Sequence, residues 1–161
     1  MDGERAAREL FRHALAALAY RAARVLRDVP AGFGSFGAGA GTRTAGEIVA
    51  HLGDLVDWAT GLAAGRHVWS PQPPGRWEAD CERFFEGVRR LDETLAGNAE
   101  LGGSVERLLQ GPVADALTHV GQLALLRRLA GSPVPGENYY KADIAAGRWP
   151  APPSARDRTA G

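Results

Sequence analysis

The sequence predicts an all-α protein whose core is a four-helix bundle. Apolar residues recur at spacings of three, four and seven along four long segments, as on one face of an α-helix. Glycine and proline gather between these segments, where they favour turns. No segment shows the alternation of apolar and polar residues that indicates a β-strand. Because amphipathic helices are stabilised by packing their apolar stripes together, the four segments are expected to form one bundle.

The first two helices have clear ends. The first is expected from Gly3 to Asp28, and Val29-Pro30 ends it because proline disfavours helical geometry in the residue before it. The glycine-rich stretch AGFGSFGAGAG follows as a loop. Thr44 and Glu47 then form a capping box, in which both side chains accept free N–H groups at a helix start. The second helix therefore begins at Thr44 and is expected to end near Gly65.

Two further helices and a short one complete the prediction. The third long helix is expected from Arg76 to Ala96, after a proline-rich loop, and a brief helix from Ser104 to Gln110. Gly111-Pro112 is expected to open the last long helix, because proline at the first helical position loses no hydrogen bond. Gly131 and Pro133 close it.

The 161 residues are expected to form one domain over residues 1–150, followed by an extended C-terminal tail. The segment from Glu137 to Trp149 is expected to pack on the bundle. Residues 151–161 are rich in proline and polar residues, and we expect them to be mobile.

Composition excludes several classes of protein. Lys+Arg and Asp+Glu both number 19, and zero net charge argues against a nucleic-acid-binding surface. No apolar run reaches the roughly 18 residues of a membrane span, and the N-terminus mixes acids and bases, unlike a signal peptide. The single cysteine, Cys81, excludes an internal disulfide and fits a cytoplasmic protein. Aromatic residues of the tail and third helix favour a homodimer that covers them.

The last helix carries two unexpected polar residues. Asp115 and His119 lie four residues apart on one face, and Gln122 follows one turn later. Because the rest of this helix is mostly apolar, both residues are expected to be at least partly buried. His51 lies on the apolar stripe of the second helix. Two imidazoles and a carboxylate suit zinc and related divalent ions, and they leave one coordination position for water or substrate.

Each of these residues also has a structural interpretation. A histidine in a core can be held by hydrogen bonds alone. Asp115 can be stabilised by the nearby helix N-terminus, or it can form an ordinary pair with His119 one turn away. In that case His51, Asp115 and His119 form a buried polar network in a non-enzymatic bundle that acts in stress-related interaction or self-association.

Other residues are candidates for the surroundings of such a site. Gln122 can hydrogen-bond a metal-bound water, orient an imidazole, or bond only to backbone. Asn138 and Tyr139 are candidates to fold over the mouth of the bundle, the alternative being a tail that covers the core. Asp54 either orients His51 or pairs with an arginine. Cys81 has an acid on each side, which raises its pKa and argues against a nucleophilic role.

The segments TAGEIVAHLGDLVDWA and DALTHVGQLALLRRLAGSP together resemble the DinB/YfiT-like superfamily of metalloenzymes. The shared pattern is a histidine inside the second helix and a residue-x-x-x-His pair before Gly-Gln in the last helix. The resemblance extends over residues 5–145. His51 matches the first ligand and His119 the last, while Asp115 stands where many members have histidine and some mycothiol-dependent relatives have a carboxylate. It implies that these three residues bind one divalent ion, zinc or nickel.

The resemblance also implies a class of reaction. Characterised relatives are thiol-dependent transferases and isomerases that bind a thiolate on the metal, such as that of mycothiol, bacillithiol or glutathione. The expected function is therefore a metal-assisted transfer or hydrolysis on a small-molecule substrate, with a low-molecular-weight thiol as the candidate co-substrate.

Overall fold

The computed structural model describes residues 2–153 and contains helices and loops, with no strand in that range. The helices are α1 (Asp2–Leu26), η1 (Phe33–Ser35), α2 (Ala45–Ala63), α3 (Trp77–Ala96), α4 (Val105–Leu108), η2 (Leu109–Val113) and α5 (Ala114–Leu129). The prediction of an all-α four-helix bundle is confirmed. No helix among the described residues is both long and apolar enough to cross a membrane.

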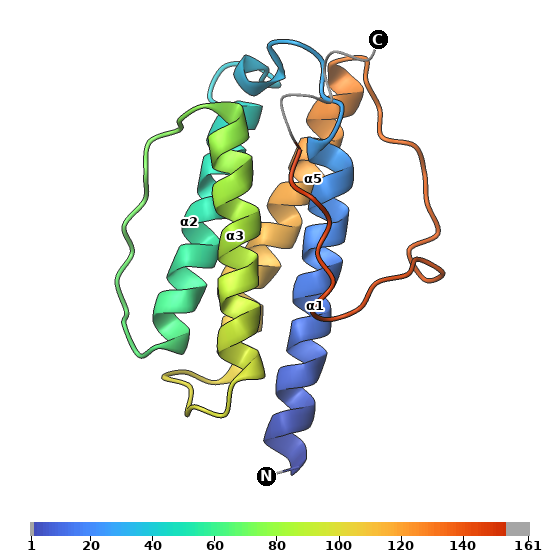
Figure 1. Ribbon diagram of the computed structural model, residues 1–161. Coiled ribbons are helices and arrows are strands. Elements are labelled where there is room, and N and C mark those ends of the chain that lie inside the picture. Colours follow the sequence, from blue (N-terminus) through green and yellow to red (C-terminus); the bar gives the residue numbers. More distant parts are fainter. Residues whose placement is uncertain (1, 154–161) are drawn as a thin grey trace.

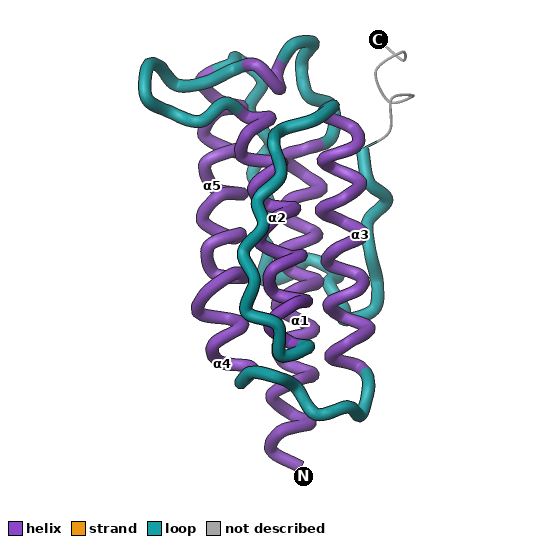
Figure 2. The backbone as a smooth tube through the Cα atoms, turned by 90° about the vertical axis from the view of Figure 1, so that its left-hand side faces the viewer, coloured by secondary structure: helices purple, strands orange, loops and turns teal. Residues whose placement is uncertain are grey.

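The four long helices lie side by side (Figure 1). Helix α2 packs on α3 and α5, and α1 packs on the same two helices. Helices α2 and α3 run in the same direction, and α1 and α5 run opposite to them. The connection from α2 to α3, residues 64–76, must therefore return along the bundle, and we call it the crossover segment. Figure 2 shows it lying over α2, between α5 and α3.

Apolar side chains from all four long helices fill the core. The largest fully buried ones include Phe11, Leu18, Leu52, Phe84, Leu91 and Leu123. Leu10 of α1 is exposed although its side chain is apolar. Successive helical residues point about 100° apart, so Leu10 faces outward where its neighbour Phe11 faces the core.

The start of α2 is as predicted. The Glu47 N–H donates to the Thr44 hydroxyl oxygen at 3.2 Å, and the Thr44 N–H donates to the Glu47 carboxylate at 2.7 Å. Both bonds of the capping box are present, which fixes the first turn of the helix that carries His51. The Glu47 pKa is lowered mainly by the hydrogen bond from the Thr44 backbone.

The last helix begins earlier than predicted. Helix α4 starts after Ser104, whose hydroxyl accepts the Arg107 N–H, and the chain stays helical through the π-helical turn η2 into α5. Pro112 therefore lies inside a helical run, and the prediction that Gly111-Pro112 opens the helix is wrong. In an α-helix the proline ring would clash with the carbonyl four residues earlier, and the wider π turn relieves that clash.

Helix α5 buries one face only. Leu117, Leu125 and Leu129 are exposed, whereas Leu123 and Leu126 are buried. Helix α5 packs on α1 and α2, and among residues 2–153 no helix covers its outer side. This places one edge of the α2–α5 interface next to solvent.

The segment after α5 packs on the bundle, as predicted for Glu137 to Trp149. Trp149 is half-buried against the core, and Pro153 is buried. Of the residues expected to be mobile, 151–161, only the first three are described by the structure, and residues 154–161 lie outside it.

Candidate metal centre

His51 of α2 meets Asp115 and His119 of α5 at the interface of the two helices. The distance from His51 Nε2 to Asp115 Oδ2 is 3.6 Å, and from His119 Nε2 to Asp115 Oδ1 it is 3.4 Å. One nitrogen or oxygen from each side chain lies within 4.8 Å of the other two. The structure therefore brings together the three residues that the sequence singled out, and we call them the His–Asp–His cluster.

The two shorter separations fit a shared ion. A tetrahedral zinc ion with ligands at about 2.0–2.2 Å holds ligand atoms about 3.3–3.6 Å apart. The distances from His51 Nε2 to Asp115 Oδ2 and from His119 Nε2 to Asp115 Oδ1 have that size, and they end on different oxygens of the carboxylate. They are long for direct hydrogen bonds, which are strongest below about 3.2 Å. The spacing thus suits a cation placed between the carboxylate and the two rings.

Gln122 determines which nitrogen of His119 carries a proton. Its Oε1 lies 2.8 Å from His119 Nδ1. With the Gln122 oxygen as acceptor, His119 Nδ1 is the donor, and Nε2 is the ring nitrogen that faces Asp115. A cation between Nε2 and the Asp115 carboxylate oxygen, which are 3.4 Å apart, would be attracted to both atoms. That cation is either a metal ion or a proton on Nε2.

The cluster is buried on one side and open on the other. His119 is 9% exposed, His51 is half-buried, and the Asp115 side chain is 47% exposed. Asp115 is thus more exposed than expected, because it lies toward the outer side of α5. The Thr118 hydroxyl donates to the Asp115 carbonyl at 2.7 Å and also contacts its carboxylate. The exposed side gives small molecules access to the ligand atoms.

The electrostatic surroundings keep His51 neutral. Burial lowers the His51 pKa, the charge of Arg43 and the neighbouring His119 lower it further, and Asp115 opposes the shift. Since a metal binds the unprotonated imidazole, a lowered pKa favours the ligand form at neutral pH.

The crossover segment covers His51 with an aromatic side chain. The Trp69 ring meets the His51 ring edge to face, with centroids 5.7 Å apart, and meets Trp58 at 5.5 Å. Sequence reasoning did not connect Trp69 with the cluster, because that contact depends on the path of residues 64–76. No local spacing in the sequence contains this information.

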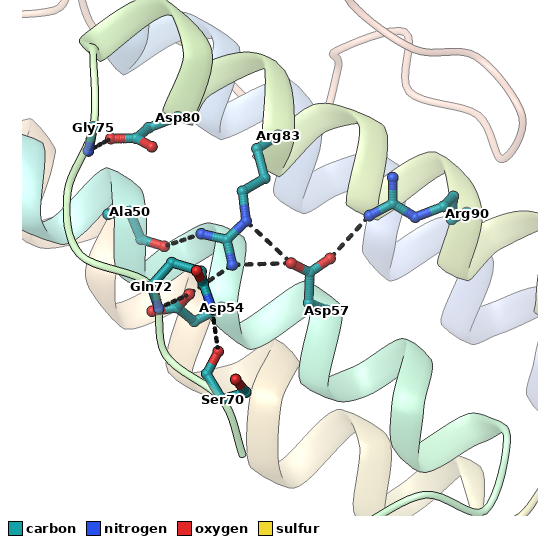
Figure 3. A network of polar contacts seen from close by, with 9 residues as sticks. All are labelled: Ala50, Asp54, Asp57, Ser70, Gln72, Gly75, Asp80, Arg83 and Arg90. Atoms are coloured by element: carbon teal, nitrogen blue, oxygen red, sulfur yellow. Dashed lines mark hydrogen bonds and ion pairs between the residues drawn. The ribbon is translucent and has the colours of Figure 1, made fainter. Parts of the chain in front are cut away.

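Buried carboxylates hold the crossover segment in place (Figure 3). Asp54 accepts the Gln72 N–H at 3.0 Å and the Arg83 guanidinium at 2.6 Å, and Asp80 accepts the Gly75 N–H at 2.8 Å. Burial lowers the pKa of Arg83, but its hydrogen bonds to the carboxylates of Asp54 and Asp57 outweigh this effect. The pKa of Arg83 is therefore raised. The expected pairing of Asp54 with an arginine is confirmed, so its carboxylate anchors the loop and does not orient His51.

The structure places Asn138 and Tyr139 away from the cluster. The Tyr139 ring packs on α1, edge to face with Tyr20 at 6.4 Å and beneath the Arg21 guanidinium at 3.9 Å. The Asn138 side chain accepts the Tyr140 N–H in a local turn. The tail thus covers α1, which was the alternative expectation. Of the three neighbours suggested by the sequence, Gln122 alone contacts the cluster.

A cavity of about 410 Å³ adjoins the cluster. Its lining consists of Ala38, Thr42, Arg43, Ile48, His119, Gln122, Leu125 and Leu126. A larger cavity of about 630 Å³ lies under the glycine-rich loop, but no residue of the cluster lines it. The smaller cavity is therefore the relevant one for chemistry at His119. Arg43 was not singled out from the sequence, because it precedes the helix and belongs to no apolar stripe.

Comparisons with known protein families, curated proteins and solved structures find no match to this chain.

Proposed function

We propose that this protein is an enzyme that binds one divalent metal ion, zinc or nickel, through His51, Asp115 and His119. The observation that carries the proposal is the hydrogen bond between His119 and Gln122. It orients His119 so that Nε2 faces the Asp115 carboxylate at 3.4 Å, which leaves room for a metal ion between them. His51 adds a second imidazole on the opposite side of that carboxylate.

The proposed reaction is a metal-assisted transfer or hydrolysis on a small molecule, with a low-molecular-weight thiol as co-substrate. The ion would supply Lewis acidity and lower the pKa of a bound water or thiol. Gln122 holds the His119 ring in one orientation, and Asp115 contributes one negative charge. The exposed side of Asp115 and the adjoining cavity give two approaches for reactants. The motif resemblance to DinB/YfiT-like metalloenzymes supports this class of chemistry.

Metal analysis tests the ligand assignment. Purified protein is loaded with zinc, freed of excess by gel filtration, and assayed by mass spectrometry for metal per chain. We expect about one zinc per chain in the wild type and a large loss in His119→Ala and Asp115→Asn. His67→Ala is the matched control, because His67 is exposed and outside the cluster. Equal zinc content in wild type and His119→Ala contradicts the assignment.

A second function is favoured by the exposed leucines of α5. If a proton takes the place of the metal between His119 and Asp115, the cluster is a polar network in a non-enzymatic bundle. Leu117, Leu125 and Leu129 then offer an apolar strip for a homodimer. Sedimentation velocity of wild type and Leu125→Glu, with zinc content measured on the same samples, separates the two proposals. A metal-free dimer that the substitution dissociates supports the second, whereas a zinc-loaded protein supports the first.

Either function is proposed for the cytoplasm. The support is Cys81, which is a free and fully buried thiol in α3 and has no disulfide partner.

A further inference from the structure

The cavity beside the His–Asp–His cluster combines apolar walls with a single fixed charge. Ile48 of α2 and Leu125 and Leu126 of α5 supply apolar surface, and Arg43 supplies a guanidinium. His119 and Gln122 belong to the same lining, so a molecule in the cavity touches the proposed metal centre. Its volume of about 410 Å³ lies within the range of small-molecule sites.

Arg43 is free to bind an anion. Among residues 2–153, no carboxylate forms an ion pair with its guanidinium. Glu47 is near enough to feel its charge, but the Glu47 carboxylate accepts the Thr44 N–H in the capping box. Glu47 also lines the larger cavity and not this one. The Arg43 charge is thus available to a ligand.

The charge balance of the site favours an anionic ligand. Arg43 lines the same cavity as His119 of the cluster. With a divalent ion bound, Arg43 and the ion bring three positive charges, whereas Asp115 brings one negative charge. A site with excess positive charge attracts anions and is stabilised when one binds.

We infer that the cavity binds a small carboxylic acid, whose carboxylate pairs with Arg43 and whose hydrocarbon part lies on Ile48, Leu125 and Leu126. This inference names the substrate class of the proposed metalloenzyme and rests on that function. A guanidinium matches a carboxylate with two parallel hydrogen bonds. One guanidinium pairs with one carboxylate group, and a phosphate monoester is the alternative anion that the test includes.

The test compares an acid with its neutral amide. Zinc-loaded, ¹⁵N-labelled protein at pH 7.5 is titrated with 3-phenylpropionate and with 3-phenylpropionamide, and Kd is read from amide shifts. Acetate tests the contribution of the apolar part, and phenyl phosphate tests the alternative anion. The same titrations are made on Arg43→Gln, Arg43→Lys and the control Arg66→Gln, whose exposed arginine does not line the cavity.

We expect the acid to bind at least tenfold more tightly than the amide, with shifts at Gln122 and Leu125. Arg43→Gln should abolish that preference, Arg43→Lys should keep part of it, and Arg66→Gln should leave it unchanged. Equal affinity for acid and amide, or a full preference in Arg43→Gln, overturns the inference. Tighter binding of phenyl phosphate than of 3-phenylpropionate also overturns the carboxylate assignment.

Zinc content is measured on the same samples and separates the two levels of proposal. Full zinc content without an acid preference leaves the metal centre standing and overturns the carboxylate site. An acid preference that depends on Arg43 in a protein that takes up no zinc supports the anion site and contradicts the metal centre.

Discussion

At the scale of single residues, Gln122 decides how His119 can act. An imidazole that is free to turn offers either nitrogen, whereas the bond from Nδ1 to the Gln122 oxygen leaves Nε2 for a ligand. Such outer partners raise metal affinity by fixing the ring before the metal binds. The effect of Gln122 on metal affinity can therefore be measured without substituting one of the three proposed metal ligands.

Gln122→Met keeps the length of the side chain and removes its hydrogen-bonding oxygen. We expect zinc affinity to fall by about tenfold or more, because the His119 ring loses its fixed orientation. Competition with a chromophoric chelator measures the Kd. Gln110→Met, an exposed residue of η2, is the control and should bind zinc as the wild type does. An unchanged Kd in Gln122→Met would show that the bond has no role in metal binding.

The raised pKa of Cys81 predicts how the stability of the protein changes with pH. Burial, then the charges of Asp80 and Glu82, raise the pKa of this thiol from 9.0 to about 12. The folded protein thus holds the proton more tightly than the unfolded chain does. The stabilising effect is complete below pH 9 and is lost as pH rises toward 12. Between pH 9 and 10 the free energy of unfolding should fall by up to about 1.4 kcal/mol from this group.

Urea unfolding of wild type and Cys81→Ala at pH 8, 9 and 10 isolates that contribution, since other groups titrate equally in both proteins. The wild type should lose more stability than the variant above pH 9. The native thiol should also resist Ellman's reagent at pH 8 until urea unfolds the chain. Parallel pH profiles for the two proteins would contradict the raised pKa.

Much of the cluster could be predicted at the residue scale. Helical periodicity alone placed His51 toward the core and put Asp115, His119 and Gln122 on one face of a helix. Arg43 and Trp69 could not be found in this way. Both lie in loops, and a loop residue reaches the site only through the three-dimensional path of the chain.

At the scale of elements, the last helix shows where local rules fail. Proline is common at the first helical position, so Gly111-Pro112 indicated a start. The chain instead continues through η2 without a break, which a local pattern cannot reveal because a π turn has no strong sequence signature. The capping box of α2 was predicted correctly, because its two bonds join residues only three apart.

In the link between α3 and α4, alanine substitutions of two adjacent glycines are expected to have very different effects on stability. A Cβ on Gly102 would lie 2.1 Å from the Gly65 backbone nitrogen, whereas a Cβ on Gly103 meets nothing closer than 3.8 Å. Gly102 also donates its N–H to the Ala63 carbonyl at 2.8 Å, which joins this link to the end of α2. Gly102→Ala must push two backbone segments apart, and we expect a loss of about 2–3 kcal/mol of stability.

Gly103→Ala is the matched control and should change the free energy of unfolding by less than about 1 kcal/mol. Urea denaturation measures both variants. Similar stability of the two proteins would mean that the close approach of residues 65 and 102 is not maintained in solution.

At the scale of the whole molecule, the site depends on topology. The cluster exists because α2 and α5 are neighbours, and the sequence predicted four helices without their order around the core. The crossover segment makes α2 and α3 parallel and brings Trp69 over His51 (Figures 1 and 2). Helix order is set by which apolar faces pack together, and it is not encoded in the periodicity of any one segment.

A ligand that bridges two helices should stabilise the entire bundle. A metal bound through His51 and His119 joins α2 to α5 in the native state only, so binding shifts the folding equilibrium. At a free zinc concentration 100-fold above Kd, the gain is about 2.7 kcal/mol. For a domain of this size that corresponds to a rise in Tm of about 5–10 °C. Calorimetry or circular dichroism should show this rise on adding zinc and its reversal by EDTA.

His119→Ala should show no zinc-dependent rise in Tm, and the control His67→Ala should show the full rise. A Tm that does not respond to zinc in the wild type would favour the protonated polar network over the metal centre.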